Sequence, residues 1–149
     1  MKMSVLAVSV IALLVSSNVA ALAAEQTLKF KLAAFFLGQK DGESHLVGVT
    51  IFPDGSLGTK DYFDKAGENG ASTGHSTYYF PKGSLTLTYS GVATGTQTGG
   101  HYKGKYQIVS GTAAYQGATG TGVVEGDYGD ASPLKNANLF DVELDVKTP

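Results

Sequence analysis

A strict alternation of apolar and polar residues near the end of the chain constrains its fold more than any other feature. From residue 140 to 147 every second side chain is apolar, and the side chains between them are charged. This period of two is typical of a β-strand with one face on a core and the other in water. We expect Asp141, Glu143 and Asp145 to point to solvent, because burying three carboxylates together would be costly. No long segment has a helical period, so the sequence predicts an all-β protein.

Similar signals recur along the chain at a regular spacing. The expected strands cover residues 28–36, 45–52, 57–63, 75–80, 84–92, 101–110, 121–128 and 140–146. Short turns between them favour antiparallel neighbours that follow one another in sequence. An open sheet would leave two exposed edges, and closure into a barrel removes them. The sequence therefore predicts a single eight-stranded antiparallel up-and-down β-barrel, and favours it over a sandwich.

The first residues have the pattern of a secretory signal peptide. Lys2 gives a positive start, residues 5–15 form an apolar run, and small residues at A-x-A spacing end at Ala23. The apolar run is too short for a membrane span, which needs about 20 residues. We therefore expect a signal peptide over residues 1–24, a β-barrel domain over residues 25–149, no membrane span, and export to the periplasm or the cell exterior.

Composition excludes several classes of function. The chain has no cysteine, which rules out disulfides, thiolate catalysis, zinc fingers and iron–sulfur clusters. Its net charge of -2 offers no basic surface to nucleic acid. The only histidines are His45, His75 and His101, and they lack the spacing of a metal site. We therefore expect neither a metal nor a cofactor.

The polar segment of residues 68–74, ENGASTG, is expected to be a loop. Its G-x-S-x-G pattern at residues 70–74 falls in a polar loop, not between the strand and the helix that a nucleophilic serine needs. We interpret the charges of Asp61, Asp64 and Glu68 as solvated loop charges.

The segment of residues 104–124 has the spacing of a family signature. It reads GKYQIVSGTAAYQGATGTGVV, and a Tyr-Phe-Pro-Lys-Gly-Ser hairpin precedes it at residues 79–84. The pattern resembles the allene oxide cyclase-like and dirigent-like barrels, and is closest to small exported bacterial members of that group. The resemblance covers roughly residues 72–146. It implies an eight-stranded calycin-like barrel with an apolar cavity, often assembled as a homo-oligomer such as a dimer or trimer.

Two features depart from the patterns of these families. Residues 28–38 hold no Glu or Asn, whereas plant allene oxide cyclases carry a carboxylate and an asparagine on and around their first strand. The chain has no arginine, which dirigent proteins place in their binding pockets. The resemblance therefore implies the fold more directly than either activity, and leaves open whether the protein is an enzyme.

Tyrosine is the most suggestive residue type for function. Most of the eight tyrosines lie on or next to expected strands. An interior of tyrosine, phenylalanine and aliphatic side chains would suit a small hydrophobic molecule with a few polar groups. We expect Phe30, Tyr89 and Tyr106 to line such a cavity and His101 to sit near its mouth. Core packing alone would explain the tyrosines equally well.

Three hypotheses for function stay open. The leading one is an exported barrel that binds a small hydrophobic ligand in its cavity. The second is an isomerase or cyclase that steers the cyclisation or coupling of a hydrophobic substrate, with His101 and Tyr106 as candidate acid–base groups. The third is a filled barrel that acts as a structural or interaction protein. Alternation does not settle which of Tyr78 and Tyr79 points inward.

Overall fold

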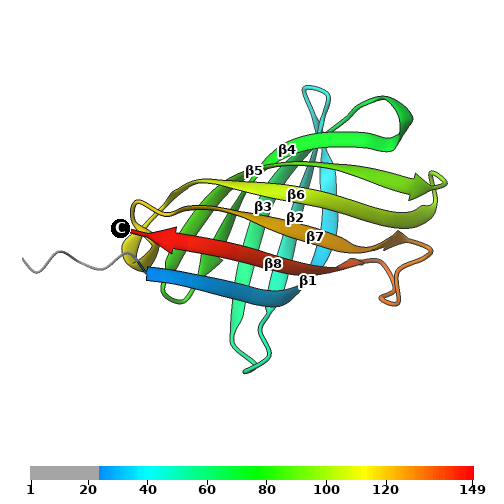
Figure 1. The fold of residues 1–149 in the computed structure, drawn as a ribbon. Helices are drawn as coiled ribbons and strands as arrows, with labels where there is room; N and C mark the ends of the chain where they lie inside the picture. Colours follow the sequence, from blue (N-terminus) through cyan, green and yellow to red (C-terminus); the bar gives the residue numbers. More distant parts are fainter. Residues whose placement is uncertain (1–23) are drawn as a thin grey trace, which may run out of the picture.

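The computed structural model describes residues 24–149, which form a closed barrel (Figure 1). Its strands are β1 (Ala24–Lys40), β2 (Glu43–Ile51), β3 (Leu57–Ala66), β4 (Ala71–Phe80), β5 (Gly83–Gly95), β6 (Gly99–Gly111), β7 (Thr119–Gly129) and β8 (Asn138–Thr148). Each strand pairs antiparallel with the next, and β8 pairs with β1 to close the sheet. The prediction of an eight-stranded up-and-down barrel is confirmed. All but the last residue of the expected signal peptide lies outside the described residues.

The alternation in β8 decides which of its faces meets the core. Val142, Leu144 and Val146 are buried, and Asp141 and Asp145 are exposed on the other face. The acidic side chains pair with β1: Lys31 Nζ lies 2.7 Å from Asp141 Oδ1, and Lys29 Nζ lies 2.9 Å from Glu143 Oε2. Exposed pairs of this kind add little to stability. The expectation that these carboxylates point to solvent is confirmed.

Aromatic side chains fill the end of the barrel that holds the two ends of the described chain. Phe30, Phe52, Tyr78 and Phe80 form one cluster, with ring centroids 5.0 to 5.5 Å apart. The short 3-10 helix η2 (Ala113–Tyr115) adds the ring of Tyr115, which lies 6.0 Å from that of Phe80. Aromatic contacts of this kind, most of them tilted or edge-to-face and one stacked, add to the stability gained from burial. This half of the interior is a packed core.

The two adjacent tyrosines of β4 point in opposite directions. Tyr78 is fully buried in the core, whereas Tyr79 is 52% exposed on the outer face. A strand with a strict period of two allows only one of them inside. Tyr78 therefore belongs to the barrel interior and borders the site described below.

Candidate functional site

The other half of the barrel interior is hollow. A cavity of about 780 Å³ lies at the end where the β3–β4, β5–β6 and β7–β8 connections meet. Its walls are mainly aromatic and aliphatic, formed by Leu32, Phe36, Leu46, Tyr62, Tyr89, Tyr102, Tyr106, Val124, Tyr128 and Phe140. The polar side chains Lys60, Asp64 and Ser72 interrupt this lining, and further polar side chains also border the cavity, namely Gln39, Ser44, Gln97, Thr98 and Asn138. Apolar walls with a few placed polar groups are typical of small-molecule sites.

Strand β3 supplies most of the polar chemistry of this cavity. Its alternation turns Lys60, Tyr62 and Asp64 toward the interior, where all three line the cavity. The residues between them face out: Asp61 contacts His45, and Phe63 stacks on its neighbours across the sheet. One strand therefore places an amine, a phenol and a carboxylate along a single line inside the barrel.

Lys60 is a buried amine inside a cage of tyrosine rings. Its side chain is only 3% exposed, and Nζ donates a hydrogen bond of 2.8 Å to the Tyr106 hydroxyl. Nζ lies 4.0 Å from the ring centroid of Tyr62, 5.0 Å from those of Tyr78 and Tyr106, and 5.4 Å from that of Tyr89. Among residues 24–149, no carboxylate oxygen lies within 4 Å of this Nζ.

Burial changes the protonation of this amine. Loss of hydration lowers the pKa of Lys60 from its usual 10.5 to about 7, and the negative charge of Asp64 partly opposes the shift. The surrounding tyrosine faces also favour the cation. Desolvation is the larger effect, so near neutral pH a substantial fraction of the amine is uncharged.

Tyr106 receives two hydrogen bonds and retains a proton to donate. The Tyr78 hydroxyl donates to the Tyr106 oxygen over 3.1 Å, and Lys60 donates to the same oxygen. Burial raises the pKa of both phenols, although the bond from Tyr78 lowers that of Tyr106 in part. Tyr106 therefore stays protonated. Neither Lys60 nor Tyr78 accepts the hydrogen of the Tyr106 hydroxyl, so Tyr106 can donate it to a bound molecule.

Asp64 and Tyr89 form a second polar pair within the cavity. The Tyr89 hydroxyl shares its one hydrogen between Asp64 Oδ1 and the Phe63 carbonyl oxygen, each 3.0 Å away. Gly74 makes this reach possible, because a Cβ atom there would collide with the Tyr89 ring and with the Phe63 carbonyl. The interpretation of Asp64 as a solvated loop charge is wrong. The strand runs to Ala66, and its alternation carries Asp64 inside.

The expected loop at residues 68–74 is also shorter than predicted. Strand β4 begins at Ala71, so Ser72 is an inward-facing strand residue and lines the cavity. Its Oγ lies 3.3 Å from the Tyr102 hydroxyl. Residues 71–74 of the G-x-S-x-G pattern lie within strand β4, and no helix follows them, which is not the setting of a nucleophilic serine.

The structure brings together two of the four side chains that we expected at the cavity. Tyr89 and Tyr106 line it. Phe30 instead lies in the packed half, against Phe52 and Tyr78. Of the two acid–base candidates, His101 and Tyr106, only the tyrosine lines the cavity.

The placement of His101 follows from the alternation of β6. Tyr102 points inward, so His101 points out and binds its neighbours on β7. Its Nδ1 lies 2.7 Å from Asp127 Oδ1, and its Nε2 lies 3.0 Å from Glu125 Oε1. The hydrogen bonds to Asp127 and then Glu125 raise the pKa of the imidazole. His101 belongs to an outer polar cluster.

Lys60 and Tyr62 are site residues that we did not expect from the sequence. Both lie on an expected strand, in the run Thr-Lys-Asp-Tyr-Phe-Asp, where Lys, Tyr and the second Asp share one face. This spacing of two residues was the feature of the sequence that could have placed all three side chains inside the barrel. A lysine is almost never fully buried without a partner, so it is normally assigned to solvent.

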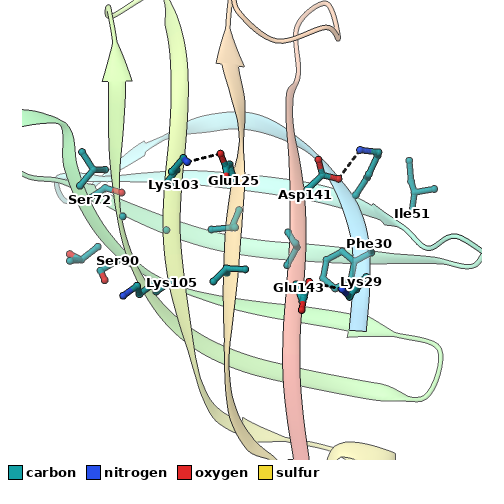
Figure 2. A pocket seen from close by; sticks show the side chains of 18 of the residues that line it. Lys29, Phe30, Ile51, Ser72, Ser90, Lys103, Lys105, Glu125, Asp141 and Glu143 are labelled. Atoms are coloured by element: carbon teal, nitrogen blue, oxygen red, sulfur yellow. Dashed lines mark hydrogen bonds and ion pairs between the residues drawn. The ribbon is translucent and has the colours of Figure 1, made fainter. Parts of the chain in front are cut away.

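A second, broader hollow of about 1230 Å³ is lined by residues of β4 to β8, of β1 and of the end of β2, and Figure 2 shows this lining, which includes Phe30. Its charged side chains are Lys29, Lys31, Lys103, Lys105, Glu125, Asp141 and Glu143. Most of them pair with one another; Lys103 Nζ, for example, lies 2.9 Å from Glu125 Oε1 (Figure 2). These paired charges are exposed to solvent, and each already has a partner of opposite charge within the protein. The interior cavity, with its buried amine, is the stronger candidate site.

Comparisons with models of known protein families, with curated proteins and with solved structures found no match for this chain. The resemblance to the allene oxide cyclase-like and dirigent-like barrels therefore stays a prediction. In the part of the chain that the structure describes, no group of three or more His, Asp or Glu side chains could hold a metal. No helix within residues 24–149 is long and apolar enough to cross a membrane.

Proposed function

We propose that this barrel binds a small, largely hydrophobic molecule in the cavity formed by its open half. The observation that carries the proposal is the cavity itself, about 780 Å³ in volume, with aromatic walls and few polar groups. Protein sites for small molecules usually measure roughly 300–1,000 Å³ and have this lining. The packed half closes one end of the barrel, so the ligand would enter from the opposite end.

The amino-terminal pattern supports export as the setting of this binding. A positive start, an apolar run and an A-x-A site form the order of a secretory signal. We propose that the barrel carries or sequesters its ligand outside the cytoplasm. A wholly filled barrel that acts only through its surface is a weaker hypothesis, because a cavity of about 780 Å³ lies among the tyrosine and phenylalanine side chains at one end of the barrel.

A matched pair of tryptophan variants tests this function. Leu46 lines the cavity, and its neighbour Val47 faces the outside of the same strand. Leu46→Trp would fill part of the cavity, whereas Val47→Trp would leave it open. The neutral fluorophore N-phenyl-1-naphthylamine, titrated into each protein, reports binding through its increase in emission.

We expect wild type and Val47→Trp to bind the fluorophore alike, and Leu46→Trp to bind at least about 10-fold more weakly. Equal binding by all three proteins would place the fluorophore elsewhere. An absence of binding to wild type would also count against the proposed function.

A further inference from the structure

We propose that the cavity captures hydrophobic aldehydes or ketones by forming a reversible imine with Lys60. This inference rests on the proposed function and names the chemical class of the ligand. An imine needs an amine that can reach the carbonyl carbon, a proton donor beside it, and a surrounding that tolerates the cationic product. The structure supplies each of these at one place.

The amine is both buried and without a counter-ion. Lys60 lines the cavity, and no carboxylate among the described residues lies within ion-pair distance of its Nζ. An amine held in this way loses its proton readily, and a lysine desolvated in a hydrophobic pocket is a known form of activated nucleophile. The low pKa of the Lys60 amine agrees with the geometry.

The proton donor is the hydroxyl of Tyr106. It lies 2.8 Å from Nζ, accepts a second hydrogen bond from Tyr78, and keeps its own hydrogen for a further acceptor. A carbonyl oxygen of a molecule attacked by Nζ would lie within reach of that hydrogen. The bond from Tyr78 would also support the negative charge that develops on Tyr106 when it gives up its proton.

The tyrosine cage suits the product. A protonated imine is a cation at the position of Nζ, where four tyrosine ring centroids lie within 4.0 to 5.4 Å. Ring faces stabilise such cations, and more strongly where water is excluded. Asp64, which lies further along β3 toward the open end, contributes a favourable negative charge.

The reaction balances without any further reagent. The Nζ lone pair attacks the carbonyl carbon, the C=O π electrons move to the oxygen, and Tyr106 protonates that oxygen to give a carbinolamine. The nitrogen, now cationic, returns a proton to the Tyr106 oxygen. Tyr106 then protonates the carbinolamine hydroxyl, which leaves as water while the nitrogen lone pair forms the carbon–nitrogen double bond. The last proton on the nitrogen passes back to Tyr106 and leaves the neutral imine. One amine and one carbonyl compound thus give one imine and one water, and hydrolysis reverses the step.

Reductive trapping tests this proposal. The purified protein would be incubated at pH 7 with decanal and sodium cyanoborohydride, which reduces the imine to a stable secondary amine. The expected product is one adduct per chain, with the mass of decanal less one oxygen atom, and peptide mapping should place it on Lys60. At pH 7 an amine of pKa about 7 has roughly 10³ times the neutral fraction of an ordinary lysine. We therefore expect Lys60 to react at least about 10-fold faster than any surface lysine.

Three variants provide the controls. Lys60→Met should lose the fast adduct, whereas Lys103→Met, which removes an exposed amine, should keep it. Tyr106→Phe keeps the ring but removes the proton donor, and should slow the adduct about 10-fold or more while leaving it on Lys60. Because mapping of the wild-type adduct needs no variant, a poorly folded Lys60→Met would not weaken the test.

The outcomes separate this inference from the proposed function. A fast adduct on Lys60 supports both. If N-phenyl-1-naphthylamine binds in the cavity but decanal labels only surface lysines, the imine inference is overturned and the binding function stands. If decanoate, and not decanal, displaces the fluorophore with an affinity that falls above pH 7, Lys60 is a receptor for carboxylates and the imine inference is again overturned. If the fluorophore does not bind and decanal labels only surface lysines, both the proposed function and the imine inference are overturned.

Discussion

The amine of Lys60 and the hydroxyl of Tyr106 meet inside the barrel over 2.8 Å, joining β3 to β6 across the interior. Neither strand is a neighbour of the other in the sheet, so closure of the barrel creates this contact. The bond lies between the packed half of the interior and the hollow half. It marks the floor of the cavity and places Lys60, the only buried lysine among residues 24–149, where a ligand would end.

We expect Lys60 to make the stability of the protein depend on pH. The pKa of the amine is about 7 in the folded state and 10.5 in the unfolded chain, so the unfolded chain binds more protons between these values. The free energy of unfolding should therefore rise with pH from about 7 upward, by roughly 1 kcal/mol per pH unit from this group. Urea unfolding of wild type and Lys60→Met between pH 6 and 9, monitored by circular dichroism, measures the difference.

In Lys60→Met this rise should be absent, and the variant should be more stable than wild type at pH 6, where the buried charge is most costly. Parallel pH profiles of the two proteins would show that Lys60 is not the buried, partly neutral amine described here.

Most of the fold can be predicted from the sequence because the barrel uses one simple rule. Alternation assigns Val142, Leu144 and Tyr106 to the inside, and the short turns order the strands. The extent of each strand is harder to predict. Polar residues near strand ends, such as Asp64 and Ser72, are assigned to loops when only the sequence is considered. The tyrosines that they contact lie on other strands and come near only when the barrel closes.

The candidate site is less predictable for a related reason. Lys60 lies on a correctly predicted strand, but a lysine in a sequence is normally assigned to solvent. Its buried position is tolerable because four tyrosine rings surround the amine, one from β3 itself and one each from β4, β5 and β6. Phe30 illustrates the opposite case. Alternation places it correctly inside, but cannot say which half of the barrel is filled.

We expect Asp64 to control the pKa of Lys60. Its negative charge holds that pKa above the value that burial alone would give. Asp64→Asn should therefore lower the pKa of Lys60 further, and Asp61→Asn, on the outer face of the same strand, should leave it unchanged. NMR titration of the lysine Cε signals measures both. An equal effect of the two substitutions would mean that the carboxylate inside the cavity has no special influence on the amine.

Gly74→Ala should damage the cavity wall. A Cβ atom at this position would meet the Tyr89 ring and the Phe63 carbonyl, so Tyr89 would have to move and release its bond to Asp64. We expect a loss of about 2–4 kcal/mol in the free energy of unfolding, which urea denaturation would measure. Gly38→Ala is the control, because a Cβ atom there meets nothing within 4 Å. A loss of similar size in the control would point to backbone effects of glycine and not to the Tyr89 contact.

The most direct test of the central claim is to locate a bound hydrophobic molecule by NMR. Isotope-labelled protein would be titrated with N-phenyl-1-naphthylamine while amide and methyl shifts are followed. We expect shifts at cavity residues such as Leu46 and Leu32, little change in the packed half, and little change at outward-facing Val123. Shifts confined to the outer hollow around Val123, or no shifts at saturating fluorophore, would contradict it.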